Sequence, residues 1–293
     1  MSREVVSLAP REPRPRRGGP VQVIAVSGGK GGVGKTSVAV NLSIALGRAG
    51  REVLLLDGDL GLANVDVLLG LAPRHTLAHV LSGECSLAEV IVRAPCGLQV
   101  APAASGVARL AALSEGEHAG LVRAFSSLGG GFDTLVIDTA AGISDGVLRF
   151  SQAAQHVLVV LRDEPTSLTD AYALIKVLSR ERGVRRFRVL ANMTQDPRQG
   201  ASLFARLERV ASRYLDVVLD YAGDVPDDPS MPRAVRLQRP VLDAFPDSPS
   251  ARAFRGLARV VATWPVPAGP RGDLEFFVER LVRRAPAPSE ALQ

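Results

Sequence analysis

The stretch of sequence that decides the fold is Gly28-Gly29-Lys30-Gly31-Gly32-Val33-Gly34-Lys35-Thr36. It fits the pattern G-x-x-x-x-G-K-[ST], with Lys35 and Thr36 in the last two positions. Residues 21–26 before it form a short apolar run rich in β-branched side chains, and apolar residues recur at helical spacing over 37–46. A strand, a glycine loop and a helix in this order are the context that a phosphate-binding loop requires, so we predict a nucleoside triphosphate site here.

The residue types of this loop suit the chemistry of a triphosphate. Glycines let backbone N–H groups approach phosphate oxygens without a clash from Cβ, and the N-terminus of the following helix adds its dipole. We expect Lys35 to contact the β- and γ-phosphates and the Thr36 hydroxyl to bind Mg²⁺. The predicted nucleotide contacts in the loop are Gly29, Lys30, Gly31, Gly32, Val33, Gly34, Lys35, Thr36 and Ser37.

Lysine is rare in this chain. Of its 35 basic residues, only Lys30, Lys35 and Lys176 are lysine, and the other 32 are arginine. The two residues are not interchangeable where a compact ammonium must lie against a phosphate. The loop pattern does not require Lys30, which either is a solvated loop residue or neutralises phosphate charge, including that of a neighbouring subunit's nucleotide. Lys176 lies on an expected helix, either facing solvent or contacting a partner.

Apolar runs alternate with helical patterns after residue 20. Runs such as 134–137 and 157–161 are almost continuously apolar, which is typical of parallel strands buried on both faces. We therefore predict a doubly wound α/β domain with a mostly parallel sheet and helices on both faces. The expected strands are 21–27, 53–57, 97–101, 132–138, 156–162, 187–192 and 217–224. The expected helices are 36–48, 115–127, 144–154, 167–181, 198–213 and 249–263.

The composition limits the classes of protein to which this chain can belong. The chain of 293 residues is 46% apolar but only 4% aromatic, which suits a large aliphatic core. Its cysteines, Cys85 and Cys96, match no metal or redox spacing and fit a reducing compartment. No run approaches the roughly 18 apolar residues of a membrane span. Of the net charge of +5, residues 1–20 carry +3, so we expect no nucleic-acid-binding surface on the body of the chain.

Aspartates follow two of the expected strands. Asp57 and Asp59 come directly after one apolar run, and Asp138 ends another and is followed by Gly142 four residues further on. Ligands of open parallel sheets bind at the C-terminal ends of the strands. An apolar run that ends in aspartate is the Walker B arrangement, which places a carboxylate near Mg²⁺. The alternative is that these residues form ordinary polar turns.

The loop and the aspartate segments resemble those of the MinD/ParA family of ATPases, with a deviant Walker A motif. In that family the first lysine, here Lys30, reaches across a nucleotide-sandwich homodimer. The resemblance implies slow hydrolysis of ATP to ADP, with Asp59 activating the attacking water and Thr36, Asp57 and Asp138 acting around Mg²⁺. It also implies contacts to adenine, from Asn192 and from a loop with Pro226 and Asp228.

Within the family, the chain is most similar to the flagellar-number regulators, the FlhG/FleN group. The residues that carry this match are 163–176, 187–193 and 274–281. The resemblance implies control of flagellar number, placement and gene expression. The implied partners are a flagellar transcriptional activator, the polar flagellar SRP-type GTPase and C-ring proteins. The alternatives are ParA-type partition and MinD-type positioning of cell division.

The C-terminal part carries an amphipathic pattern. Asp273 is a plausible N-cap, and Arg280, Arg283 and Arg284 lie toward the expected C-terminal end. Such a helix either packs on its own core or lies in a membrane interface. The resemblance favours a cytoplasmic protein that associates peripherally with the inner membrane, at the cell pole. The apolar stripe is Leu274, Phe277, Val278, Leu281 and Val282.

The sequence thus predicts five segments. They are a flexible basic arm at 1–20, an ATPase domain at 21–264, a linker at 265–272, an amphipathic helix at 273–284 and a disordered tail at 285–293.

Overall fold

The structure of the chain is a computed structural model. It describes residues 20–282 except 95, 105, 107–109, 111–112, 129–130, 267–268, 270–271 and 273, and it describes only the backbone of 281 and 282. Within these residues, no helix has the length and apolar character needed to cross a membrane. Almost all of the expected arm at 1–20 and the whole expected tail at 285–293 lie outside the described residues.

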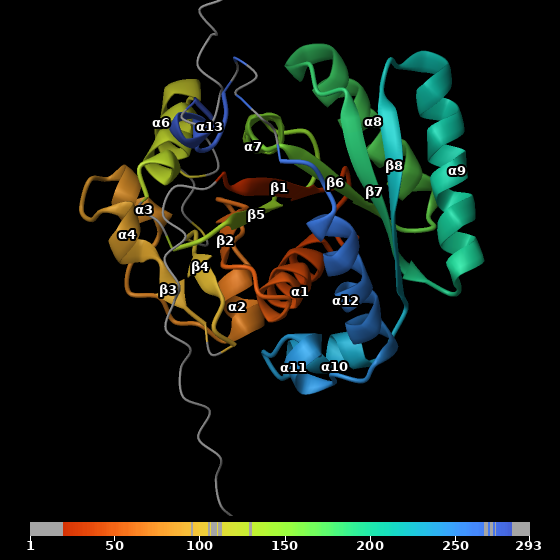
Figure 1. Ribbon diagram of the computed structural model, residues 1–293, viewed down its shortest axis with the longest axis horizontal. Coiled ribbons are helices and arrows are strands. Elements are labelled where there is room, and N and C mark those ends of the chain that lie inside the picture. Colours follow the sequence, from red (N-terminus) through yellow and green to blue (C-terminus); the bar gives the residue numbers. More distant parts are fainter. Residues whose placement is uncertain are drawn as a thin grey trace, which may run out of the picture.

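One eight-stranded sheet forms the centre of the fold, with the strand order β3-β4-β2-β5-β1-β6-β7-β8 (Figure 1). Every neighbouring pair is parallel except β3 and β4. The predicted doubly wound, mostly parallel sheet is therefore confirmed. The strands are β1 (Gln22–Ser27), β2 (Val53–Gly58), β3 (Val92–Arg93), β4 (Gln99–Ala101), β5 (Thr134–Thr139), β6 (His156–Leu161), β7 (Arg186–Thr194) and β8 (Val218–Pro226).

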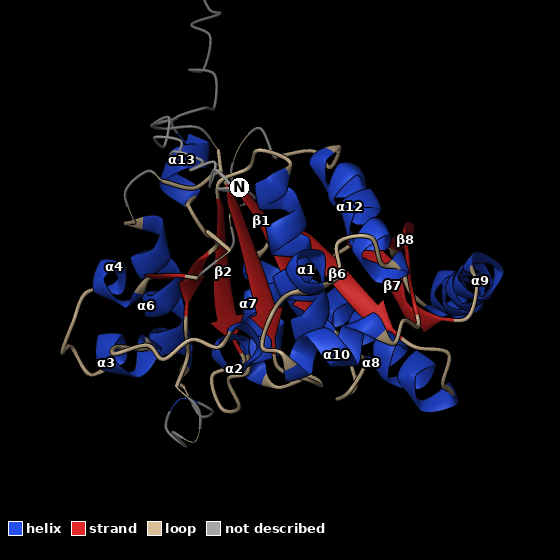
Figure 2. Cartoon of the chain, turned by 90° about the horizontal axis from the view of Figure 1, so that it is seen from below, coloured by secondary structure: helices blue, strands red, loops and turns tan. Residues whose placement is uncertain are grey.

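Helices cover both faces of the sheet (Figures 1 and 2). One face carries α1 (Lys35–Arg48), α2 (Val65–Leu69), α10 (Ser230–Arg236), α11 (Val241–Ala244) and α12 (Pro249–Ala262). The other face carries α3 (Leu77–Leu81), α4 (Leu87–Val90), α6 (Glu115–Ser126), α7 (Asp145–Ala153), α8 (Pro165–Arg182) and α9 (Pro197–Tyr214).

The central strands are apolar on both sides because each side packs on a different core. On β1, Ile24 and Val26 belong to the core under α1 and α12, whereas Val23 and Ala25 belong to the core on the opposite face. Alternate residues of a strand point to opposite faces, so two helical layers require a continuous apolar run. This requirement explains why the central strands could be recognised from sequence.

The edge strands of the sheet and the short helices differ from the predictions. The expected strand 97–101 is only Gln99–Ala101, and the short antiparallel strand β3 beside it was not predicted. The expected strand 217–224 extends to Pro226. The five short helices α2, α3, α4, α10 and α11 were also missed, because four to seven residues are too few to show a helical period.

The C-terminal helix begins later than predicted. Helix α13 (Val278–Val282) starts at Val278, and the residues before it that the structure describes, 274–277, are not helical. Phe276 and Phe277 are both buried, and Phe277 has a φ of 58°. Neighbouring residues of a helix point about 100° apart, so the irregular backbone allows both rings to enter the same core. The proposed N-cap Asp273 and the basic residues Arg283 and Arg284 lie outside the described residues.

The segment 274–282 is docked on the protein. The ring of Phe276 stacks on Phe150, and the ring of Phe277 meets Phe132 edge to face. The backbone N–H of Phe277 donates to Ser126 Oγ over 2.7 Å, and Arg280 donates to the carbonyl oxygen of Leu128 over 3.0 Å. In this structure the apolar side chains of the segment therefore complete the core over α6 and α7.

Candidate nucleotide-binding and hydrolysis site

The glycine loop connects β1 to α1, as predicted. Gly34 is the N-cap of α1 and has a φ of 92°, a left-handed conformation that side chains rarely adopt. A Cβ at Gly34 would lie 2.4 Å from Asn192 Nδ2, and one at Gly29 would lie 2.1 Å from the carbonyl oxygen of Asp170. Glycine is therefore required at both positions for the loop to close against β7 and α8.

Lys35 lies folded over the loop. Its side chain is buried, and its Nζ donates to the carbonyl oxygen of Lys30 over 3.2 Å. Burial lowers the pKa of Lys35, an effect that the nearby carboxylates of Asp138 and Asp59 partly oppose. An ammonium that is held over the glycine loop in this way is placed to bind phosphate oxygens.

Asp57 and Asp138 lie side by side at the C-terminal ends of β2 and β5, where they are register partners. Both are almost fully buried. Burial, followed by the charge of Asp138, raises the pKa of Asp57 well above its usual value. Burial also raises the pKa of Asp138 to about 7, although a hydrogen bond with Thr36 and the charge of Lys35 act in the opposite direction. Two buried carboxylates on neighbouring strands repel each other, so a bound cation would stabilise the charged forms of both.

The two carboxyls differ in their partners. Asp57 accepts hydrogen bonds from the backbone N–H groups of Asp59, Asn64 and Val65 at 3.1–3.2 Å, so it fixes the loop that carries Asp59. Asp138 Oδ1 is buried and has no hydrogen-bond partner among the described residues. Mg²⁺ is commonly held by one or two protein oxygens together with phosphates and water. Asp138 and Thr36 fit this ion better than Asp57 does.

Asp59 lies in a loop directly beyond β2. Its Oδ1 accepts from the backbone N–H of Leu62 over 3.1 Å, and its charge acts on both Lys35 and Asp138. The structure therefore brings the predicted catalytic carboxylate to the same end of the sheet as the glycine loop. The side chain of Leu62 is 70% exposed, so this loop presents an apolar residue to solvent.

The side chain of Lys30 forms hydrogen bonds with residues of its own chain. Its Nζ donates to Glu164 Oε2 over 2.9 Å and to Thr166 Oγ1 over 2.8 Å, at the start of α8. Arg162 also pairs with Glu164 at 3.3 Å. These cations lower the pKa of Glu164. Sequence reasoning did not assign Glu164 and Thr166 to the site, because only the fold brings the end of β6 next to the glycine loop.

Of the three residues expected at adenine, Asn192 and Asp228 have structural partners. Asn192 Nδ2 donates to the carbonyl oxygen of Val33 over 2.7 Å, which ties the glycine loop to β7. Asp228 accepts from the backbone N–H groups of Ser230 and Ser250 and from the Ser250 hydroxyl. Burial would raise the pKa of Asp228, but these hydrogen bonds lower it to about 2. Pro226 is the last residue of β8, so the chain turns toward α10 directly after it.

Comparison with known proteins identifies the family. Residues 20–262 match the ParA family model described as NUBPL iron-transfer P-loop NTPase. The chain is 58% identical over 273 residues to the antiactivator FleN of Pseudomonas aeruginosa, covering 93% of this chain and 97% of the relative. It is 30% identical to the flagellum site-determining protein YlxH of Helicobacter pylori, covering 90% and 91%.

A solved structure agrees with the fold. The septum site-determining protein MinD from Pyrococcus horikoshii, complexed with Mg-ADP, superposes with a TM-score of 0.70 at 28% identity, over 83% of this chain and 96% of that one. The glycine loop, the buried aspartates and these similarities agree with one another. The chain therefore belongs to the ParA/MinD family of P-loop ATPases, which use ATP or ADP with Mg²⁺.

Proposed function

We propose that this ATPase is a molecular switch that controls the number and placement of flagella and the expression of flagellar genes. The observation that carries the proposal is the 58% identity to the antiactivator FleN over 93% of the chain. The similarity to a flagellum site-determining protein over 90% of the chain agrees with it. Because both matches cover at least 90% of the chain, the shared role is expected to depend on the nucleotide cycle.

In this proposal the glycine loop binds ATP, with Lys35 on the β- and γ-phosphates and Thr36 and Asp138 around Mg²⁺. The bound Mg²⁺ neutralises charge that develops on the transferred phosphoryl group. Asp59 orients the attacking water, and Asp57 holds the loop of Asp59 through three backbone N–H groups. Asn192, Pro226 and Asp228 shape the adenine side by fixing the glycine loop and the turn after β8.

The ATP-bound form is proposed to be a homodimer in which Lys30 supports the nucleotide of the partner subunit. Lys30 lies at the surface, where its contacts with Glu164 and Thr166 are accessible to solvent and therefore weak. Leu62 and Ile143, in the loops after β2 and β5, are 70% and 49% exposed. Exposed apolar side chains beside a nucleotide site suit a surface that a second copy covers.

The C-terminal segment is proposed to leave its docking site in the ATP dimer and to bind the cytoplasmic face of the inner membrane, at the cell pole. Its apolar side chains and Arg280 would then face anionic lipid. The proposed protein partners are a flagellar transcriptional activator, the polar flagellar SRP-type GTPase and C-ring components.

A second candidate function is positioning of cell division. The chain is 31% identical to the septum site-determining protein MinD of Synechocystis over 81% of its length. An experiment in the native cell separates the two functions. A strain that lacks the gene is complemented with wild type or with Lys35→Ala, and flagella and minicells are counted. Loss of flagellar number control without minicells agrees with the flagellar role, whereas minicells with normal flagella contradict it. ParA-type partition predicts plasmid or chromosome loss instead.

A further inference from the structure

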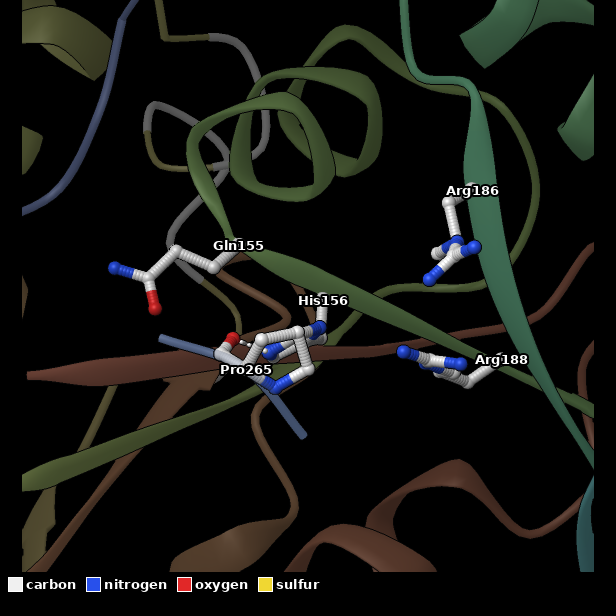
Figure 3. A pocket seen from close by; sticks show the side chains of 5 residues that line it. All are labelled: Gln155, His156, Arg186, Arg188 and Pro265. Carbon is white, nitrogen blue, oxygen red and sulfur yellow. Dashed lines mark hydrogen bonds between the residues drawn. The ribbon is translucent and has the colours of Figure 1, made fainter. Parts of the chain in front are cut away.

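A small basic pocket lies at the end of the sheet opposite the nucleotide site. Its cavity of about 190 Å³ is lined by Gln155, His156, Arg186, Arg188 and Pro265 (Figure 3). Residues 155, 156, 186 and 188 lie at the N-terminal ends of β6 and β7, whereas the glycine loop follows the C-terminal end of β1. A ligand here would therefore be separate from the bound nucleotide.

The strand period explains why two arginines share the pocket. Arg186 and Arg188 are two residues apart on β7, so their side chains leave the same face of the sheet. Figure 3 shows the guanidinium group of Arg188 directed toward His156, and that of Arg186 directed toward Arg188. His156 Nε2 lies 3.0 Å from the carbonyl oxygen of Pro265, which fixes the ring beside the cavity.

Arg188 is nine-tenths buried, and two neighbouring side chains hold its guanidinium in place. It pairs with Asp220, its register partner on β8, and its guanidinium lies 5.2 Å from the centre of the Trp264 ring. Its Nε is nevertheless buried without a hydrogen-bond partner among the described residues. A buried guanidinium without a full set of acceptors is costly, so an anion in the adjoining pocket would stabilise it through its charge.

The pocket also has an excess of positive charge. Asp220 is the carboxylate that neutralises both arginines, since it lies 3.6 Å from Arg186 Nε and also pairs with Arg188. Two guanidinium groups thus share one carboxylate, and none of the lining residues is acidic. The side chain of Arg186 is 57% exposed, so an ion can reach the pocket from solvent.

We propose that this pocket binds the phosphate group of a small anion. Arginine offers several N–H donors in a planar fork, which suits oxyanions. Arg186 and Arg188 leave the same face of β7 and both line the cavity, so two guanidinium groups can donate to one anion. A phosphate has more acceptor oxygens than a carboxylate and can accept from both groups.

Tryptophan emission provides a direct test, because Trp264 is the single tryptophan of the chain and lies against both Arg188 and His156. Inorganic phosphate is titrated into full-length protein saturated with Mg-ADP, so that the glycine loop is already occupied. Sodium chloride of the same ionic strength is the control. We expect a saturable change in emission with phosphate only. A change that does not saturate, or that chloride reproduces, overturns the proposal.

Two variants locate the binding site. Arg186→Gln should weaken phosphate binding at least about tenfold, because a hydrogen bond to a charged group is lost. Arg185→Gln is the matched control, since Arg185 is an exposed neighbour that pairs with Asp216 and does not line the pocket. Equal affinity of the two variants contradicts the proposal. Titration with glycerol 3-phosphate distinguishes the source of the phosphate: tighter binding than inorganic phosphate indicates an ester, and weaker binding indicates the free ion.

Discussion

The ammonium of Lys30 lies 2.9 Å from a carboxylate oxygen of Glu164, at the start of α8 on the same chain. Lys30 and Lys35 belong to one loop, but they have different environments. Lys35 is buried and spans the loop, whereas Lys30 is held at the surface by Glu164 and Thr166. We therefore expect the two lysines to be separable by mutation.

Lys35→Ala should abolish detectable binding of Mg-ADP, because the loop loses its buried phosphate ligand. Lys30→Ala should change the affinity for Mg-ADP by less than about tenfold, since Lys30 makes exposed contacts. It should prevent dimerisation with ATP. Calorimetric titration measures the first property and light scattering coupled to gel filtration measures the second. A Lys30→Ala variant that dimerises like wild type would contradict the separate roles.

Gly34→Ala should reduce nucleotide affinity at least about tenfold, because alanine at a φ of 92° is strained and its Cβ would meet Asn192. Gly31→Ala is the matched control within the same loop. A Cβ at Gly31 would meet nothing within 4 Å, and its φ is not positive. Calorimetric titration of both variants with Mg-ADP checks the difference. Equal losses would show that the closure of the loop against β7 is unimportant.

The two buried carboxyls should make stability depend on pH when nucleotide and Mg²⁺ are absent. Burial raises the pKa of Asp138 to about 7, so the folded protein binds a proton that the unfolded chain has released above about pH 4. The stabilisation from this proton is present at low pH and is lost as pH rises through about 7. Asp138→Asn should therefore gain Tm relative to wild type between pH 5 and pH 8, measured in EDTA. A constant difference in Tm over that range would refute the raised pKa.

The docked C-terminal segment should contribute strongly to stability. Phe276→Ala should lower the free energy of unfolding by about 3–5 kcal/mol, because the ring is fully buried between Phe125 and Phe150. Leu274→Ala should cost less, since Leu274 is only partly buried. Urea denaturation measures both. Equal and small effects would mean that the segment is detached in solution.

Release of the C-terminal segment can be tested by mutating a residue of α6 that holds it in the docked position. Ser126→Ala removes the acceptor of the Phe277 N–H and should increase sedimentation with anionic liposomes in Mg-ADP. Ser127→Ala is the matched control, since the Ser127 hydroxyl donates to Arg123 within α6. Wild type should sediment more with Mg-ATP than with Mg-ADP. If Ser126→Ala and Ser127→Ala sediment alike in Mg-ADP, docking does not limit membrane binding.

The sheet and the glycine loop could be predicted because their signals are local. A buried parallel strand such as Leu54-Leu55-Leu56 is apolar on both faces, and the loop pattern needs only nine consecutive residues. The contacts of Lys30 with Glu164 could not, because they join residues 134 positions apart. The basic pocket could not be predicted for the same reason, since His156 and Arg188 come together only through the pairing of β6 with β7. Helix α13 was misjudged because Phe276 and Phe277 are neighbours that both need burial.

The Asp57 carboxylate shows what a sequence pattern leaves open about this site. The sequence predicts this carboxylate at a strand end, and the structure places it near the end of β2 as the register partner of Asp138. Its two oxygens already accept three backbone N–H groups, and these contacts depend on the course of the loop through Asn64 and Val65. A pattern of aspartates cannot show which carboxylate remains without a partner.

The measurement that tests the switch most directly is the mass of Asp59→Ala, by light scattering coupled to gel filtration, in Mg-ATP and in Mg-ADP. Asp59 is proposed to orient the attacking water, so its loss should spare ATP binding and halt hydrolysis. We expect this variant to be a stable dimer in Mg-ATP and a monomer in Mg-ADP. A variant that binds ATP and stays monomeric would contradict the proposed ATP-dependent dimer.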